Sequence, residues 1–305
     1  MKISMLVTIL LGLNIYASDV RGVSTAQFTT EILLTIGAEK QLVGTANLWN
    51  EIAPELKEQF EKIPELSKRS PTKEQFYELN PNFLTGWKSI STKKNLGDVE
   101  ELEKNGVEVY IPKTLESNSL ESLYEDILFF GKKFNVETNA RALIEKLKKQ
   151  VELIKNKNIY KKKLKVFGYD GKEDFPYVVG GGAIGNTLIE IAGGENIYKE
   201  TNFGFGSGQW EKIIDSNPEV IVIIDYDNAS SEEKIEFLKN RSPIKMLEAV
   251  KNNNFIVIPL NYISSGIHVV KGIEILSDGI DKIRNKNREW KLSIFIHPQD
   301  FQISQ

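Results

Sequence analysis

One short phrase occurs twice in the chain, and a long amphipathic segment separates the two copies. Residues 73–86 and residues 210–223 both read Glu, five residues, Asn-Pro, one residue and then an apolar run. The glutamates that open the two copies are Glu74 and Glu211. Because a proline ends a helix and a continuous apolar run is typical of a buried parallel strand, each copy predicts a short helix followed by such a strand. The duplication therefore predicts two similar α/β lobes.

The segment between the copies, residues 137–160, predicts one long helix. Its apolar residues recur at spacings of four, four and three, which places them on one helical face. At ~1.5 Å per residue, such a helix is ~30 Å long, which is the diameter of a small domain. We therefore expect an N-terminal lobe at residues 18–136 and a C-terminal lobe at residues 161–305, joined by this single interlobe helix.

Shorter segments alternate between helical and strand patterns in both lobes, which predicts two Rossmann-like lobes with parallel sheets and helical crossovers. The strongest strand patterns of the second lobe are residues 164–170, 220–227 and 255–260. Residues 268–283 carry apolar positions at helical spacing and predict a closing helix. Residues 291–296 read as an edge strand.

The N-terminus predicts a signal peptide at residues 1–17. Lys2 gives a small positive start, the apolar run that follows is too short to span a bilayer comfortably, and Ala17 suits a cleavage site. The chain has no cysteine, which excludes a disulfide framework and a lipid-anchoring cysteine after the leader. An exported, unanchored protein is retained by an outer membrane, so we expect a soluble protein of the periplasm.

The amino-acid composition argues against several other functional classes of protein. A formal net charge of −3 does not suit a nucleic-acid-binding protein, which needs a basic surface with interleaved aromatic residues. Without cysteine, and with His268 and His297 as its two histidines, the chain can assemble neither a thiol nucleophile nor a multi-histidine metal site. We therefore expect no catalytic residues, no bare-metal site and no cofactor, and a monomer that binds a ligand and is not an enzyme.

Aromatic residues follow several predicted strands in both lobes. In open parallel sheets, ligands bind beyond the carboxyl ends of the strands, so these residues predict an aromatic-lined cleft for a flat or bulky ligand. His268 opens the closing helix, where it either faces the cleft or simply occupies a helix end. The aromatic residues that we expect at the cleft from this pattern are Trp49, Trp87, Tyr169, Tyr226 and Tyr262.

A glycine-rich loop suggests an alternative function for the chain. Gly180, Gly182 and Gly185 match GxGxxG before a helix, and Glu200 follows at about the spacing of the dinucleotide-binding fingerprint. This pattern keeps open a periplasmic oxidoreductase that uses residues 180–185 to bind a dinucleotide. The helix is barely two turns long, however, which favours a loop whose glycines let the backbone approach the cleft.

The two glutamates of the repeated phrase predict a docking function. Glu74 and Glu211 stand at the same distance from the same Asn-Pro pair in both halves, so they would form two symmetric acidic points for a two-fold partner with basic sockets. The alternative is that each simply suits the positive end of a helix dipole.

Taken together, these features resemble the class III periplasmic binding proteins of ABC importers for iron-siderophores, haem and cobalamin. The resemblance runs along nearly the whole mature chain, and the stretches that carry it are residues 29–46, 80–87, 137–160, 186–198 and 210–223. It implies a periplasmic receptor that binds an iron chelate or a cobalamin-like ligand between its lobes and delivers it to a permease dimer.

The resemblance also implies roles for particular residues. Glu74 and Glu211 would engage arginines on the permease, and the ligand would lie near Trp49, Trp87, Tyr169, Phe205 and Tyr226. Many siderophore-binding members carry an arginine where this chain has His268, which argues against a catecholate ligand clamped by arginine.

Overall fold

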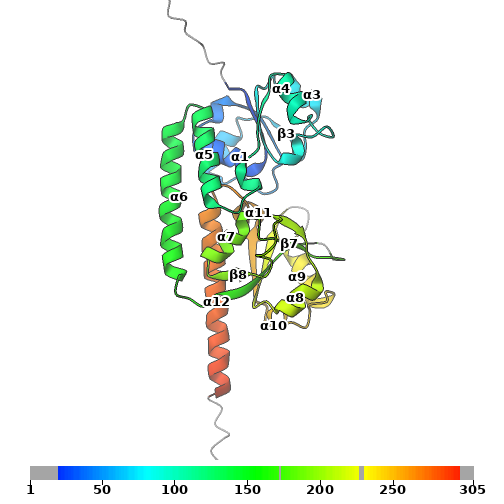
Figure 1. Ribbon diagram of the computed structural model, residues 1–305, viewed down its shortest axis with the longest axis vertical. Coiled ribbons are helices and arrows are strands. Elements are labelled where there is room, and N and C mark those ends of the chain that lie inside the picture. Colours follow the sequence, from blue (N-terminus) through cyan, green and yellow to red (C-terminus); the bar gives the residue numbers. More distant parts are fainter. Residues whose placement is uncertain (1–19, 172, 227–229, 296–305) are drawn as a thin grey trace, which may run out of the picture.

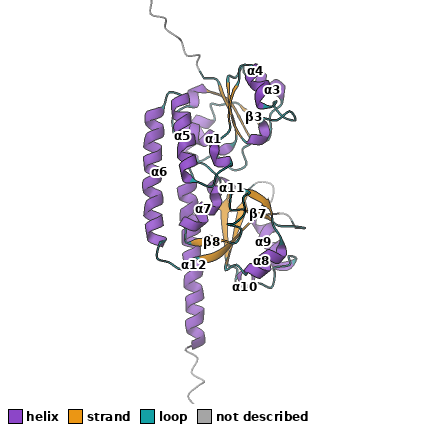
Figure 2. Cartoon of the chain, viewed as in Figure 1, coloured by secondary structure: helices purple, strands orange, loops and turns teal. Residues whose placement is uncertain are grey.

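The computed structural model describes residues 20–171, 173–226 and 230–295, which form two lobes joined along one side by a long helix (Figure 1). The predicted signal peptide and His297 lie outside the described residues. Each lobe is a sheet between two layers of helices (Figure 2). Among the described residues, no helix has both the length and the apolarity that a bilayer crossing requires.

The N-terminal lobe contains sheet A, whose strands are all parallel and follow the order β3-β2-β1-β4-β5. The strands are β1 (Gly22–Thr25), β2 (Leu42–Ala46), β3 (Glu65–Ser67), β4 (Phe83–Gly86) and β5 (Glu108–Tyr110). The α-helices are α1 (Gln27–Thr35), α2 (Lys57–Phe60), α3 (Lys73–Glu78), α4 (Val99–Lys104) and α5 (Leu120–Lys133). Four 3-10 turns complete the lobe: η1 (Glu39–Gln41), η2 (Pro54–Leu56), η3 (Lys88–Ile90) and η4 (Lys113–Leu115).

The C-terminal lobe contains sheet B, in the order β11-β10-β6-β7-β9, with β8 paired to β6. Its strands are β6 (Leu164–Gly171), β7 (Tyr177–Val179), β8 (Gly194–Asn196), β9 (Phe205–Ser207), β10 (Val220–Asp225) and β11 (Phe255–Pro259). Its helices are α7 (Ile184–Ile191), α8 (Trp210–Ser216), α9 (Ser231–Asn240), α10 (Glu248–Lys251), α11 (Leu260–Ile263) and α12 (Val269–Phe295).

Two expectations for this lobe were wrong. Sheet B is mixed and not parallel, because β7 runs antiparallel to both β6 and β9. The short connection from β6 to β7 permits a hairpin but not a helical crossover. Residues 291–295, predicted as part of an edge strand, continue α12, since the sequence from Ile280 to Phe295 contains neither glycine nor proline to end a helix.

The duplicated phrase adopts the same structure in both lobes. In each copy a short helix, α3 or α8, leads through an Asn-Pro pair into a buried strand, β4 or β10. Asn80 and Asn217 both take left-handed backbone conformations, with φ of 47° and 44°. Asparagine tolerates this conformation at the end of a helix, and the proline that follows prevents the helix from continuing. The predicted repeat of helix, stop and strand is therefore confirmed.

The interlobe helix α6 (Glu137–Asn158) packs against α5 of the first lobe and against α7 and α12 of the second. Its buried face is Ala140, Ile144, Leu147 and Val151. These side chains belong to one cluster of buried apolar residues that contains members from both lobes. The lobes therefore share a continuous core on the side where α6 lies (Figure 1).

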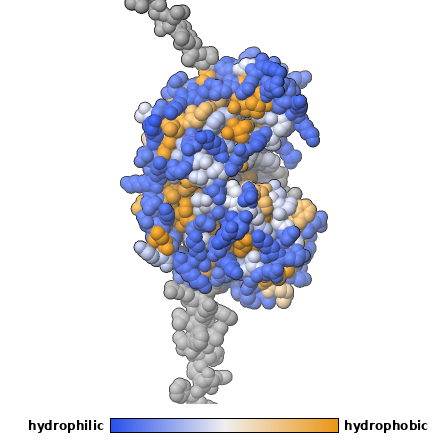
Figure 3. Space-filling view, in the orientation of Figure 1, coloured by the Kyte–Doolittle hydropathy of each residue, from blue (hydrophilic) through white to orange (hydrophobic). Residues whose placement is uncertain are grey.

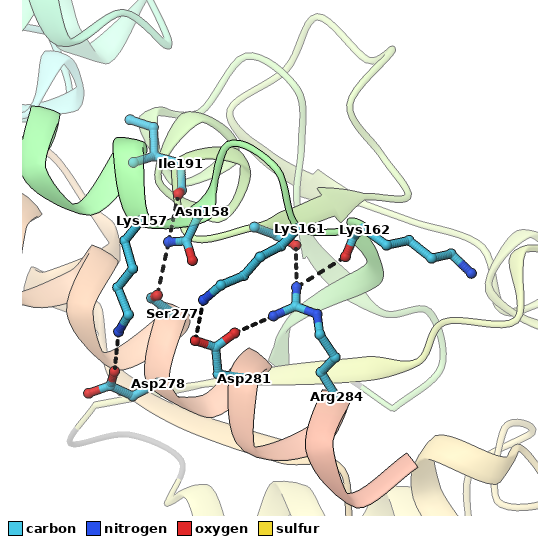
Figure 4. Close-up of polar contacts among 10 residues, drawn as sticks. Lys157, Asn158, Lys161, Lys162, Ile191, Ser277, Asp278, Asp281 and Arg284 are labelled. Atoms are coloured by element: carbon cyan, nitrogen blue, oxygen red, sulfur yellow. Dashed lines mark hydrogen bonds and ion pairs between the residues drawn. The ribbon is translucent and has the colours of Figure 1, made fainter. Parts of the chain in front are cut away.

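Both ends of α6 are held by hydrogen bonds. At the first end, Asn139 Nδ2 donates to the carbonyl of Ile36 at 2.9 Å. At the second end, Asn158 Nδ2 donates to Ser277 Oγ at 2.9 Å, and Lys161 forms a 2.6 Å ion pair with Asp281 (Figure 4). The helix is thus fastened to the N-terminal lobe at one end and to α12 of the C-terminal lobe at the other.

Candidate ligand-binding cavity

A cavity of about 400 Å³ lies between the two lobes. Figure 3 shows the outline of the molecule indented between the lobes, on the side away from α6. The N-terminal lobe lines the cavity with residues from α1 and from the carboxyl ends of β4 and β5. The C-terminal lobe contributes the glycine loop, β9 and the segment after α11. The lining residues are Phe28, Trp87, Lys88, Ser89, Thr114, Leu115, Gly182, Ala183, Ile184, Gly204, Phe205, Ser264 and Ser265.

Aromatic side chains from both lobes dominate the apolar wall. Phe28 and Trp87 pack edge to face with ring centroids 5.3 Å apart, and Phe205 lines the cavity from the other lobe. Trp87 reaches this place because the chain turns at Gly86, whose φ is +140° and whose added Cβ would lie 2.2 Å from Thr25 Oγ1. Glycine is the residue that allows this conformation and this close approach.

Two fully buried side-chain groups of the lining residues have no hydrogen-bond partner among the described residues. Trp87 Nε1, from the N-terminal lobe, and Ser264 Oγ, from the C-terminal lobe, are buried and unbonded. Lys88 is different, because its ammonium is ion-paired with Glu116 at the surface. This pairing, chiefly through the hydrogen bond that Lys88 donates, lowers the pKa of Glu116. The cavity therefore offers neutral donors and one cation that already has a partner.

Polar and aromatic contacts join the lobes on both flanks. On one flank Asn118 Nδ2 donates to the carbonyl of Gly181 at 2.7 Å, and Thr187 Oγ1 donates to the carbonyl of Asn118 at 2.7 Å. On the other flank Trp49 and Tyr226 pack edge to face with ring centroids 6.5 Å apart. The structure therefore shows the lobes in contact with one another.

A further contact between the lobes, between Glu31 and His268, is buried. Glu31 Oε2 lies 3.0 Å from His268 Nε2, with 1% and 10% of the two side chains exposed. The contact has ion-pair distance but lacks the alignment of a good hydrogen bond. Glu31 Oε1 accepts from Gln27 Nε2 and from the backbone N–H of Ala53, both at 3.2 Å. This network connects α1 of one lobe to the start of α12 in the other.

The structure separates the ligand residues expected from sequence into four groups, the last of which is Tyr169 alone. Trp87 and Phe205 line the cavity. Trp49 and Tyr226 contact each other across the lobes but are not among the lining residues. Tyr262 packs against His268, with ring centroids 4.7 Å apart and ring planes tilted by 37°, and His268 in turn forms the buried contact with Glu31.

Tyr169 lies away from this cavity. It is 1% exposed and packs against Phe167 and Trp210 in the core of the C-terminal lobe. Burial raises its pKa above the ordinary value. Because β6 is buried on both faces, the alternation of its residues gives no sign of which side chains point to the cleft.

Glu74 and Glu211 lie in equivalent places. Each is exposed in the first turn of its helix, α3 or α8. In Figure 1 these two helices belong to different lobes and lie on the side of the molecule opposite α6.

The glycine loop packs backbone against backbone. An added Cβ at Gly180, Gly181 or Gly182 would lie 2.0–2.5 Å from a carbonyl oxygen of residues 199–203. The strand before the loop, β7, is antiparallel to its neighbours, whereas the dinucleotide fingerprint belongs to a parallel βαβ unit. The loop nevertheless reaches the cavity through Gly182, in agreement with the expectation that its glycines let the backbone approach the cleft.

Several residues of the site were not predicted. Leu115 and Ile184 line the cavity, and Glu31 forms the buried interlobe contact. One feature of the sequence could have pointed to Glu31: it is the one charged residue in the segment that forms α1. Nothing in the local pattern distinguishes the others from ordinary core or loop residues.

Residues 23–262 match the family described as periplasmic binding protein. The chain belongs to the periplasmic binding protein family. This membership and the two-lobed architecture confirm the resemblance to the class III receptors of ABC importers. The family is one of substrate-binding proteins, which argues against the dinucleotide-dependent oxidoreductase.

Individual members of the periplasmic binding protein family are similar to different extents. The high-affinity heme uptake system protein IsdE of Staphylococcus aureus is 28% identical over 148 residues, or 45% of this chain and 48% of that protein. The chain therefore spans about half the length of the curated relatives that it matches. A crystal structure of a periplasmic binding protein from Veillonella parvula has 28% identity and a TM-score of 0.81, over 87% of this chain and 92% of that one. An ABC-type Fe³⁺-hydroxamate transport system protein from Saccharomonospora viridis shares the fold, with 18% identity and a TM-score of 0.72, over 85% of this chain and 92% of that one.

Proposed function

We propose that this chain is the receptor of an ABC importer, which captures an iron chelate or a cobalamin-like ligand between its lobes and delivers it to a permease dimer. The observation that carries this proposal is the interlobe cavity with aromatic side chains from both lobes, Phe28, Trp87 and Phe205. Its volume of about 400 Å³ lies within the range of small-molecule sites. On this proposal the protein works as a monomer in the periplasm and catalyses no reaction.

Aromatic walls suit a ligand of this class because a chelate or a macrocycle presents a broad carbon surface. A buried aromatic contact of this kind contributes on the order of 1–3 kcal/mol to binding. A ligand held by two or three such rings therefore reaches a useful affinity without a covalent bond or a dense set of charges. The name of the relative IsdE, a heme uptake protein, is in keeping with such a ligand.

Delivery requires contact with the permease, and Glu74 and Glu211 are the residues that we assign to it. Both are exposed, one on each lobe, at the same place in the duplicated phrase. A carboxylate that inserts among arginines forms a charge-assisted pair that a neutral side chain cannot replace. Loss of one partner from such an interface costs on the order of 2–5 kcal/mol.

The test compares these acids with exposed acids of the same helices. Glu74→Ala and Glu211→Ala should each impair import in cells that contain the cognate permease, and the double variant should nearly abolish it. The controls, Glu78→Ala and Asp215→Ala, should import at the wild-type rate. Ligand binding by the purified variants should stay unchanged because neither glutamate lines the cavity. Import by the double variant at the wild-type rate would refute the docking role.

A further inference from the structure

The C-terminal end of α6 carries an exposed cluster of apolar and basic side chains. Residues 153–165 contain six lysines and no acidic residue, in a chain whose formal net charge is −3. Leu153 is 64% exposed, Ile159 58% and Tyr160 97%, and these are three of the eight large apolar side chains that are exposed among the described residues. We call this cluster the α6-end patch, and its members are Leu153, Ile159, Tyr160, Lys162 and Lys163.

The two lysines of the α6-end patch have charges that no carboxylate compensates directly. Lys162 and Lys163 are exposed, and neither has an ion-pair partner among the described residues. In Figure 4 the side chain of Lys162 extends away from the ion pairs beside it. Glu195 lies close enough for the charge of Lys163 to contribute to its lowered pKa, but the ion pair of Glu195 is with Lys199. Both ammonium groups are therefore available to an anionic surface.

Helix α12 leaves the body of the molecule beside the α6-end patch and continues alone (Figure 1). Ile283 is still buried, whereas the helix runs on to Phe295, which at ~1.5 Å per residue is a further ~18 Å. By sequence, residues 285–295 comprise three basic residues, one acidic residue and four large apolar ones, among them Trp290. Because so short a helix is marginal in water without tertiary packing, a surface that covers these turns would stabilise them.

Polar contacts fix the projecting helix to the α6-end patch. Lys157 lies 3.6 Å from Asp278 of α12, next to the hydrogen bond of Asn158 and the ion pair of Lys161 that also join the two helices (Figure 4). The patch and the projecting turns therefore lie at one end of the molecule in a fixed relation. A single extended partner can contact both at once.

We propose that this end of the protein binds the surface of an anionic lipid bilayer. Basic side chains attract anionic headgroups, and tryptophan, tyrosine and aliphatic side chains enter the headgroup region beside them. One such signal alone gives marginal membrane binding, whereas an apolar element together with a basic patch holds a protein at the surface. The inference adds a second contact surface to the proposed receptor and does not depend on which ligand the receptor carries.

A bilayer fits this end better than a second copy of the chain does. A two-fold contact would bring the same lysine-rich patches of two copies face to face, where their charges repel. The glutamates assigned to the permease, Glu74 and Glu211, lie on helices at the side opposite α6, so a receptor held at this end leaves both uncovered (Figure 1).

The experiment measures binding to lipid vesicles by flotation. It uses the mature chain, residues 18–305, so that the apolar residues of the predicted signal peptide do not contribute. The vesicles contain either phosphatidylcholine alone or phosphatidylcholine with ~30% phosphatidylglycerol, and we expect the anionic vesicles to be bound at least ~10-fold more tightly. Raising the salt concentration to ~0.5 M should weaken this binding strongly. Equal binding to both kinds of vesicle, or none to the anionic ones, would overturn the inference.

Variants of the α6-end patch locate the binding surface. Lys162→Gln combined with Lys163→Gln should weaken binding to anionic vesicles ~25-fold, or about fivefold per lysine. The matched control combines Lys93→Gln and Lys94→Gln, two exposed lysines before α4, a helix at the other end of the molecule, and should bind as the wild type (Figure 1). Tyr160→Ser should weaken binding about five- to tenfold without changing the melting temperature, because the ring is exposed. An equal loss in the control pair would show attraction to the net charge alone and would overturn the inference.

A chain that ends at Lys286 tests the projecting helix. It retains the buried part of α12 and the hydrogen bond that Lys286 Nζ donates to the carbonyl of Asn252. Its vesicle binding should fall at least ~10-fold, while its melting temperature stays that of the mature chain. Wild-type vesicle binding by this chain would overturn the assignment of α12 to the bilayer. Dimerisation of the mature chain in sedimentation velocity, without vesicle binding, would assign this end to a second copy instead and overturn the inference. Ligand titrations test the receptor function separately from all of these outcomes.

Discussion

The buried contact between Glu31 and His268 gives a quantitative prediction about how the lobes are held together. His268→Ala removes the imidazole and leaves the Glu31 carboxylate, 1% exposed, with Gln27 and the backbone of Ala53 as its remaining donors. Breaking a buried pair by removing one partner typically costs ~3–5 kcal/mol. Because two donors remain and the contact is poorly aligned, we expect a cost of about 2–3 kcal/mol.

A double-mutant cycle measures the interaction itself. Glu31→Gln keeps the shape of the side chain and removes its charge, so the cost of His268→Ala should be smaller in the Glu31→Gln background. We expect a coupling free energy of about 1–2 kcal/mol. The control, Glu55→Gln, alters an exposed acid of the same lobe and should show no coupling.

The assay is urea unfolding of the ligand-free protein, followed by tryptophan fluorescence and circular dichroism. Coincident transitions establish that the lobes unfold together, as their shared core predicts. If the losses of unfolding free energy in the two single variants sum to the loss in the double variant within ~0.5 kcal/mol, the two residues do not interact. That result would refute the assignment of this pair as a link between the lobes.

Three further predictions concern motion, the aromatic wall and pH. Ligand should close the lobes by only a few degrees, because α6 is fastened at both ends, so large compaction in small-angle scattering would contradict this view. Trp87→Ala should lower ligand affinity about tenfold or more. It should also destabilise the ligand-free protein by about 1–3 kcal/mol, because the indole ring packs against Phe28. Unchanged ligand affinity in calorimetry would exclude Trp87 from the site. Burial raises the pKa values of Tyr124 and Tyr226 to about 12, so unfolded tyrosines lose protons that the folded ones retain. This pKa difference contributes to the free energy of unfolding below pH ~10, and the contribution is lost as the pH rises toward ~12. In urea titrations at increasing pH, Tyr124→Phe should therefore lose less of its free energy of unfolding over this range than the wild type.

The sequence allowed the fold to be predicted where local patterns determine it. The long helix follows from the spacing of its apolar residues, and the paired lobes follow from the repeated Asn-Pro phrase, whose asparagines both adopt left-handed backbone conformations. The mixed pairing of sheet B was not predicted, although the Asp170-Gly171 pair at the end of β6 is a pattern typical of a hairpin and not of a helical crossover.

The site was predicted less completely, for a related reason. Trp87 and Phe205 were expected and line the cavity, but Tyr169 points into the core from a strand that is buried on both faces. Glu31 and His268 are far apart in the chain, and their contact arises only from the packing of one lobe on the other. Contacts between lobes leave no periodic signal within either lobe.

The fastening of α6 at both ends has a consequence for competition at the membrane. On the proposed function, a receptor whose lobes barely move presents nearly the same pair of carboxylates, Glu74 and Glu211, whether it is empty or loaded. Empty copies then occupy permeases as readily as loaded ones. When the ligand is scarce and receptor copies outnumber ligand molecules, a cell that makes still more receptor should therefore import the ligand more slowly, not faster.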